Sequence, residues 1–138
     1  MTNWIYYSLI TVISFTMMSL IFKKLTTLEP KSEIINFYFF FFSTLAISIS
    51  LFFRQTKFRI PTKTLPLFLL LAIIAVFGNY ASISAIRLAP NPGYVKGIQT
   101  LEVVLLTIAS YFLFRSEITV AKVIGAILVV GGVILLSL

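Results

Sequence analysis

The sequence of 138 residues contains no cysteine and no histidine, and it has only four acidic residues. The absence of cysteine excludes a disulfide framework, and the absence of both types removes the usual zinc ligands. Nucleophilic catalysis by a cysteine–histidine or serine–histidine pair is excluded for the same reason. We therefore expect no metal, no cofactor and no enzymatic activity.

Charge of either sign is also scarce. Charged residues make up 11% of the chain and hydrophobic residues 59%, whereas a soluble domain carries about 25% charged residues. This deficit predicts that lipid surrounds most of the chain. The net charge of +7 would suggest a nucleic-acid partner in a soluble protein. Here the bases lie between apolar segments, which is typical of loops that face lipid headgroups, so we expect a lipid bilayer and no nucleic acid.

Five long apolar segments account for most of the sequence. Each is close to the ~20 residues that a helix needs to cross the hydrocarbon core. The pattern predicts an all-α fold, a polytopic membrane bundle of five transmembrane helices. The segments are Trp4–Phe22, Ile34–Phe53, Leu65–Leu88, Gly93–Phe114 and Thr119–Leu138.

The breaks between these segments are polar or contain proline. Lys23-Lys24 and the stretch Glu29–Glu33 ("EPKSE") are expected to end the first segment. Pro90 and Pro92 are expected to end the third, because proline lacks the backbone donor that a helix interior requires. The residues Arg115–Glu117 predict a tight turn before the last segment. The second segment is followed by Arg54, Lys57, Arg59 and Pro61.

The odd number of segments predicts that the two termini lie on opposite sides of the membrane. An excess of lysine and arginine normally marks the cytoplasmic side. Six such residues share the side of the N-terminus and five lie on the other side. Two interpretations stay open: the loop after the second segment fixes the N-terminus inside, or the chain inserts in both orientations. The first group is Arg54, Lys57, Arg59, Lys63, Arg115 and Lys122, and the second is Lys23, Lys24, Lys31, Arg87 and Lys96.

The fourth segment carries the polar residues Lys96, Gln99, Glu102 and Ser110. At 100° per residue these lie on one helix face. Glu102 is placed near the bilayer midplane, where an acidic side chain costs at least ~2.5 kcal/mol. It is therefore a candidate for substrate binding or proton coupling, together with Gln99 and Lys96. The alternatives are that Glu102 is a buried partner of Lys96 or Arg87, and that Lys96 is an interfacial anchor.

The third segment contributes Asn79 near its middle, on the same face as Ser82. The default interpretation is an interhelical hydrogen bond. The functional alternative is that Asn79 lines a polar cavity with Glu102.

The last segment carries small residues along one side, namely Ala121, Gly125 and Gly132. Small residues at such spacing let helix backbones approach closely. We expect a packing surface there, within the bundle or between subunits.

The second half of the sequence carries recognisable motifs. In "FLFRSE" followed by "ITVAKVIGAILVVGGVILL", Glu117 lies in the turn and Gly125 and Gly132-Val133 lie in the helix. The stretch "AIRLAPNPGYVKGIQTLE" precedes them. With these motifs the sequence resembles the EamA-type transporters of the drug/metabolite transporter superfamily. Glu102 stands at the glutamate of the Glu-Pro pair that many members carry in this helix, with Val103 in place of the proline.

The resemblance implies that residues 1–138 form a single EamA-like five-helix repeat. Such transporters usually combine two repeats in inverted orientation, with the substrate path between them. The implied function is a transporter subunit of the bacterial cytoplasmic (inner) membrane, which moves a small metabolite, amino acid or drug-like solute by alternating access. The implied partner is a second copy in an antiparallel homodimer, or a related five-helix protein in a heterodimer. The alternative is a non-transporting assembly partner or a remnant half-transporter.

Overall fold

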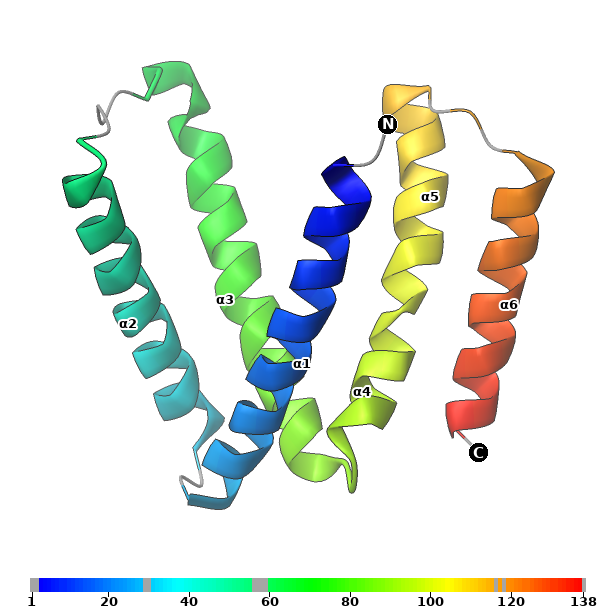
Figure 1. Ribbon diagram of the computed structural model, residues 1–138, viewed down its shortest axis with the longest axis horizontal. Helices are drawn as coiled ribbons and strands as arrows, with labels where there is room; N and C mark the ends of the chain where they lie inside the picture. The colour runs from blue at the N-terminus through cyan, green and yellow to red at the C-terminus, as the bar shows by residue number, and fades with distance from the viewer. Residues whose placement is uncertain (1–2, 29–30, 56–59, 116, 118, 138) are drawn as a thin grey trace. The chain divides into compact units, whose positions relative to one another are not determined.

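The computed structural model describes the chain except for residues 1–2, 29–30, 56–59, 116, 118 and 138 (Figure 1). The described elements are all helical, which confirms the predicted all-α membrane bundle. The elements are α1 (Asn3–Leu28), α2 (Ser32–Phe53), the short 3-10 helix η1 (Thr62–Thr64), α3 (Leu65–Leu88), α4 (Pro92–Gln99), α5 (Leu101–Phe114) and α6 (Val120–Ser137).

Four stretches are long and apolar enough to cross a membrane. They are Trp4–Leu28, Ser32–Phe53, Thr62–Leu88 and Pro92–Phe114, the last of which combines α4 and α5. The apolar part of the fifth helix, α6, is shorter and runs from Val120 to Leu136. Its 17 residues correspond to about 26 Å, at the lower end of what a transmembrane helix needs.

The lysine pair does not end the first helix, so that part of the prediction is wrong, whereas the helix does end directly before the predicted break at Glu29–Glu33. Helix α1 continues through Lys23 and Lys24 to Leu28. Lysine is a good helix former, so a lysine pair ends the apolar run without ending the helix. The amine of Lys23 donates to the carbonyls of Ile86 (3.0 Å) and Arg87 (3.3 Å) in the last turn of α3. This contact supplies donors to carbonyls that a helix end leaves without an intrahelical partner.

The other helix ends agree with the sequence. Helix α2 ends at Phe53. Arg54 is its C-cap residue, and Gln55 follows with a positive φ of 49°. Lys57 and Arg59 lie outside the described residues. Helix α4 begins after Asn91, whose side-chain oxygen accepts a hydrogen bond from the backbone N–H of Gly93 at 2.8 Å.

The turn predicted at Arg115–Glu117 also begins where expected. Helix α5 ends at Phe114, and Arg115 has φ 50° and ψ 37°, the left-handed conformation that commonly closes a helix. Ser116 lies outside the described residues.

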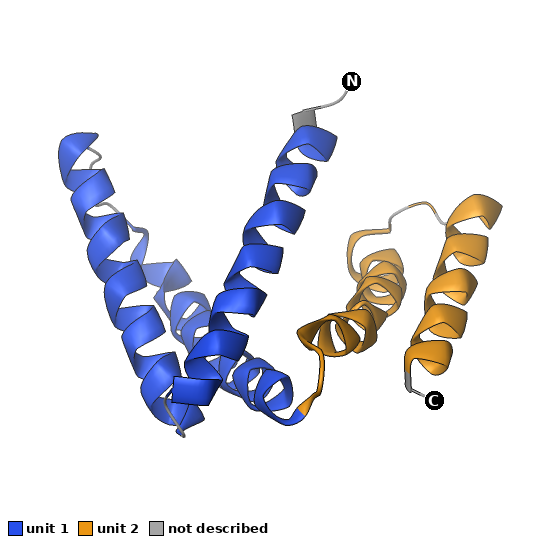
Figure 2. Cartoon of the chain, turned by 60° about the horizontal axis from the view of Figure 1, so that its bottom comes forward, with its two compact units in different colours: residues 1–88 blue, residues 89–138 orange. Residues whose placement is uncertain are grey.

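The chain divides into two compact units, residues 1–88 and residues 89–138 (Figure 2). In the first unit α3 packs against both α1 and α2. Its buried apolar residues are Phe22, Ile35, Ile83 and Ile86. They come from the end of α1, the start of α2 and the end of α3, so the core lies at the end of the unit where α1 connects to α2. The interpretation of residues 1–138 as one repeat remains a prediction, because packing units do not reveal repeats.

The second unit comprises α4, α5 and α6, with α6 packed against both other helices. Its buried apolar side chains are Val95 on α4 and Val133 on α6. Gly97 lies where the two helices approach: a Cβ at this glycine would stand 2.3 Å from Cδ1 of Leu136. The missing side chain therefore gives α6 the room to contact α4.

Candidate functional site

The polar face predicted on the fourth segment is partly assembled in α4. The amine of Lys96 donates to Oε1 of Gln99 at 2.9 Å, and both side chains are half-buried. Residues three apart share a helix face, and this contact confirms that these two do.

The predicted continuous fourth helix is interrupted at Thr100, which is a correction to the sequence interpretation. The N–H of Thr100 reaches the carbonyls of both Lys96 and Gly97 at 3.1 Å, and the N–H of Val103 bonds three residues back to the Thr100 carbonyl at 2.9 Å. The hydroxyl of Thr100 also donates to the Gly97 carbonyl. A side-chain hydroxyl that binds a backbone carbonyl competes with the α-helical pattern, and three-residue bonds tighten the turn.

Glu102 lies directly after this break, in the first turn of α5, and its side chain is exposed. It is ten residues beyond Pro92, about 15 Å along a stretch of 23 residues, and so near the middle of that stretch. Lys96 donates its hydrogen bond to Gln99 and interacts with Glu102 only through its charge, because among the described residues of the second unit no ion pair joins the two. An exposed carboxylate at this depth would cost at least ~2.5 kcal/mol in lipid. It therefore requires water or another protein surface.

Asn79 makes the interhelical hydrogen bond that the default interpretation predicted. Its amide Nδ2 donates to Oδ1 of Asn36 on α2 at 2.7 Å. Asn36 in turn donates to the carbonyl of Val76 on α3 at 3.1 Å. The two amides therefore join α2 to α3 within the first unit. The cavity that Asn79 was predicted to share with Glu102 remains a prediction, because α3 and α5 belong to different units.

Two polar partners on α2 were missed in the sequence. Asn36 is buried, with 6% of its surface exposed, and it is the one amide in the apolar stretch Ser32–Phe53. A single amide in an otherwise apolar stretch was the sequence signal that could have identified it, because such an amide needs a hydrogen-bond partner on another helix. Glu33, one turn earlier, accepts a long hydrogen bond of 3.4 Å from the hydroxyl of Tyr80 on α3.

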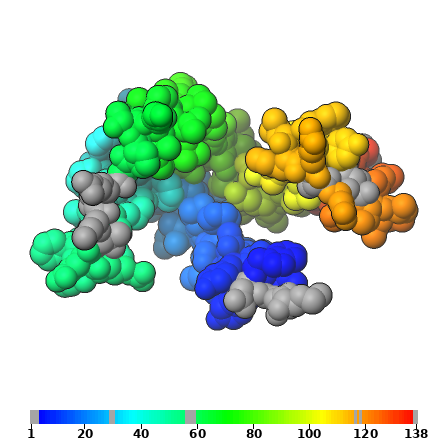
Figure 3. All heavy atoms as spheres, turned by 90° about the horizontal axis from the view of Figure 1, so that it is seen from above, coloured from blue at the N-terminus to red at the C-terminus, as the bar shows by residue number. Residues whose placement is uncertain are grey.

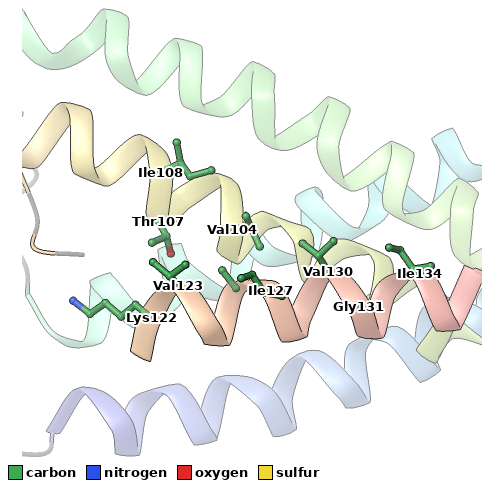
Figure 4. Close-up of a pocket in the computed structure, with 10 residues that line it drawn as sticks. Val104, Thr107, Ile108, Lys122, Val123, Ile127, Val130, Gly131 and Ile134 are labelled. Carbon is green, nitrogen blue, oxygen red and sulfur yellow. The ribbon is translucent and has the colours of Figure 1, made fainter. Parts of the chain in front are cut away.

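A groove of about 460 Å³ lies between α5 and α6 in the second unit (Figure 4). Its wall is almost wholly apolar, and neither Gln99 nor Glu102 lines it. The hydroxyl of Thr107 is satisfied by the Val103 carbonyl at 2.7 Å. Lys122 lines the groove with its stem, while its amine donates to the Glu117 carbonyl at 2.8 Å. The groove can therefore accept apolar groups, and it offers little to orient a polar solute.

The small-residue face of α6 is open. Ala121, Gly125 and Gly132 are all exposed. Among the described residues, no atom lies within 4 Å of the position that a Cβ would take at either glycine. Within the second unit α6 instead packs through Val133 and Leu136. The surface is therefore not used inside this unit, and its role between subunits remains a prediction.

Comparison with known protein families gives one match. The model of a family described as the EamA-like transporter family matches residues 2–138. Searches of the curated proteins and of the solved structures gave no match. The family match covers nearly the whole chain, including α4, the Thr100 break and Glu102.

Proposed function

Because the chain belongs to the EamA-like transporter family, we propose that it is a transporter subunit that moves a small metabolite, amino acid or drug-like solute, with Glu102 in the solute path. The observation that carries this proposal is the position of Glu102. It is exposed, it lies near the middle of the stretch Pro92–Phe114, and it directly follows the break at Thr100. Transporter sites are typically formed near the bilayer midplane by discontinuous helices.

Gln99 and Lys96 support the proposal from the preceding turn. Their hydrogen bond holds one polar face of α4 together up to the break. Gln99 carries a side-chain amide, a group that can both donate and accept hydrogen bonds. We assign Glu102 the coupling role, because a carboxylate can take up and release a proton and the other two residues cannot do so as readily.

The experiment is transport by the reconstituted protein, with a panel of labelled solutes, with and without a proton gradient. Glu102→Gln removes the charge and keeps the shape. Uptake that loses its dependence on the gradient in this variant supports the coupling role. Glu117→Gln is the matched control, since Glu117 lies in the turn before α6. Unchanged rate and unchanged pH dependence in Glu102→Gln refute the coupling role of Glu102.

We further propose that the second wall of the path comes from an inverted partner. Exposed Glu102 requires a polar surface opposite it, and an inverted repeat is the arrangement typical of such transporters. The six-to-five balance of lysine and arginine gives little orienting bias. The open face at Gly125 and Gly132 offers a contact surface. An antiparallel homodimer satisfies all three observations, and a heterodimer with an oppositely oriented five-helix relative satisfies the first and third.

Topology reporters distinguish these assemblies. A C-terminal tag that reports each side of the membrane must give signal on both sides if the homodimer forms. Signal on one side alone refutes the homodimer and leaves the heterodimer. A protein with its C-terminus on one side alone is then co-expressed with an oppositely oriented five-helix relative. If this pair moves no solute, the non-transporting assembly partner becomes the better description.

A further inference from the structure

Serine and threonine hydroxyls make two kinds of hydrogen bond to nearby backbone carbonyls in the part of the chain that the structure describes. One kind reaches four residues back, and the residues that make it lie inside continuous helices, namely Ser8, Thr11, Thr16, Ser19 and Thr107. The other kind reaches three residues back, and the residues that make it lie where an α-helix begins, ends or is interrupted, namely Thr26, Thr27, Thr64 and Thr100. The shorter bond therefore marks the places where the α-helical pattern stops.

Thr100 makes the shorter bond in the middle of a membrane-crossing stretch, Pro92–Phe114. Its backbone has φ −63° and ψ −13°, against a ψ of about −42° in a regular α-helix. In a continuous α-helix the carbonyl of Gly97 would accept the N–H of Leu101. Here that carbonyl instead accepts both the N–H and the hydroxyl of Thr100. The hydroxyl thus occupies the acceptor that would join α4 to α5.

The interruption also changes the direction of Glu102 relative to Gln99. In a continuous α-helix, residues three apart lie about 60° apart around the axis. Three-residue hydrogen bonds wind the chain more tightly, so that residues three apart eclipse one another. Such bonds span residues 97–100 and 100–103. Glu102 is therefore brought toward the line of Gln99, which accepts the hydrogen bond of Lys96, and Lys96 interacts with Glu102 through its charge.

Helix α6 fixes the opposite side of α5. The two helices pack side by side, as the end view in Figure 3 shows. Val104, Thr107 and Ile108 line the groove between them. Glu102 precedes Val104 by two residues, which is about 200° around the helix, so it points away from α6. Because α6 packs against both α4 and α5, the turn at Thr100 sets the register between the polar residues of these two helices.

We propose that Thr100 is a positioning residue for Glu102. Its hydroxyl keeps α4 and α5 as separate helices by binding the Gly97 carbonyl. The tighter turn aligns the Glu102 carboxylate with Gln99 and Lys96 as one polar strip. The proposal rests on the proposed function of Glu102 in the solute path. The competing explanation is a break that other contacts make, in which the hydroxyl is only satisfied, and removal of the hydroxyl distinguishes the two.

Amide hydrogen exchange, measured by NMR on the intact chain in nanodiscs, tests the origin of the break. Thr100→Val makes the Gly97 carbonyl available to the N–H of Leu101, so exchange at Leu101 should slow by roughly five-fold, the factor for one backbone hydrogen bond. Thr100→Ser keeps a hydroxyl and should leave this exchange unchanged. Thr107→Val is the matched control, because it removes a four-residue hydroxyl bond inside α5. Equal exchange at Leu101 in Thr100→Val and in the wild type overturns the proposal.

The reaction of Glu102 with dicyclohexylcarbodiimide, mapped by mass spectrometry, tests the alignment without any transport. We expect Gln99→Leu to change the rate by about two-fold or more, the lower end of the coupling between neighbouring residues. The same substitution should have no effect on the rate in Thr100→Val, because the carboxylate is then out of line with residue 99. An equal effect in the two backgrounds, or none in either, overturns the proposal.

Uptake driven by a proton gradient then connects the position of Glu102 to transport. Thr100→Val should lower the gradient-dependent part of the uptake, whereas Thr100→Ser and Thr107→Val should retain it. Wild-type uptake in Thr100→Val, together with slowed exchange at Leu101, overturns the proposal, because the break would then position no group that transport needs. If the wild type itself moves no solute, the proposed function fails, and the exchange and labelling results still decide the role of Thr100.

Discussion

The close approach of α4 and α6 at Gly97 makes a quantitative prediction. In Gly97→Ala the new Cβ would stand 2.3 Å from Cδ1 of Leu136, whereas carbon atoms in contact prefer about 3.5–4.0 Å. Either the leucine must move by more than 1 Å or the helices must separate. Leu136 is 45% exposed and can change rotamer, so we expect about 1–2 kcal/mol, within the range for small-to-large substitutions.

The control for this prediction is Gly125→Ala. Alanine is favoured over glycine within a helix by about 1 kcal/mol, and this gain would partly conceal the clash at Gly97. Gly125 is also in a helix and has open space at its Cβ position, so it reports the gain alone. We expect Gly97→Ala to be about 1–2 kcal/mol less stable than Gly125→Ala in reversible unfolding from mixed micelles, followed by circular dichroism.

The double variant tests the cause. Leu136→Ala removes the atom that meets the new Cβ, so Gly97→Ala should cost little in its presence. A double-mutant cycle then gives a coupling of about 1 kcal/mol or more between the two positions. If Gly97→Ala unfolds like Gly125→Ala, or if the cycle gives no coupling, the close contact between α4 and α6 is wrong.

Two further contacts give predictions of their own. Asn36→Ala should destabilise the protein by about 1–2 kcal/mol, because it removes two interhelical hydrogen bonds; unfolding measurements should show coupling with Asn79→Ala and none with Thr16→Ala, whose hydroxyl bonds within its own helix. Lys23→Met should destabilise by about 1 kcal/mol, because it removes the donor to the last carbonyls of α3. Lys24→Met, one residue later and exposed, should leave the unfolding free energy nearly unchanged, and equal effects of the two variants would contradict this role of Lys23.

The long apolar segments were predictable because lipid imposes a simple length rule. The segment Leu65–Leu88 was predicted at the bounds that α3 has, with prolines after it that cannot continue the helix. The stretch Glu29–Glu33 marked the end of α1 correctly, whereas the lysine pair did not, because a helix continues through lysines when they reach the membrane surface. Whether a helix ends with its apolar run or continues beyond it depends on local helix propensity, which the hydrophobic pattern does not report.

The candidate site was only partly predictable. Helical spacing correctly joined Lys96 to Gln99. The break at Thr100 was missed because it arises without a proline, from a threonine hydroxyl that competes for the carbonyl of Gly97. The partner of Asn79 was also missed, since helical spacing relates residues within one helix and says nothing about which residue of another helix stands opposite.

The length of α3 has a consequence for the choice of bilayer. Its 24 residues span about 36 Å, roughly 6 Å more than the hydrocarbon core of a typical bilayer. A helix with this excess length tilts or kinks, or the bilayer becomes thicker around it, at a fraction of a kcal/mol for each ångström. Lipids with longer acyl chains therefore relieve the mismatch at α3, so acyl-chain length becomes a control on the stability of the first unit.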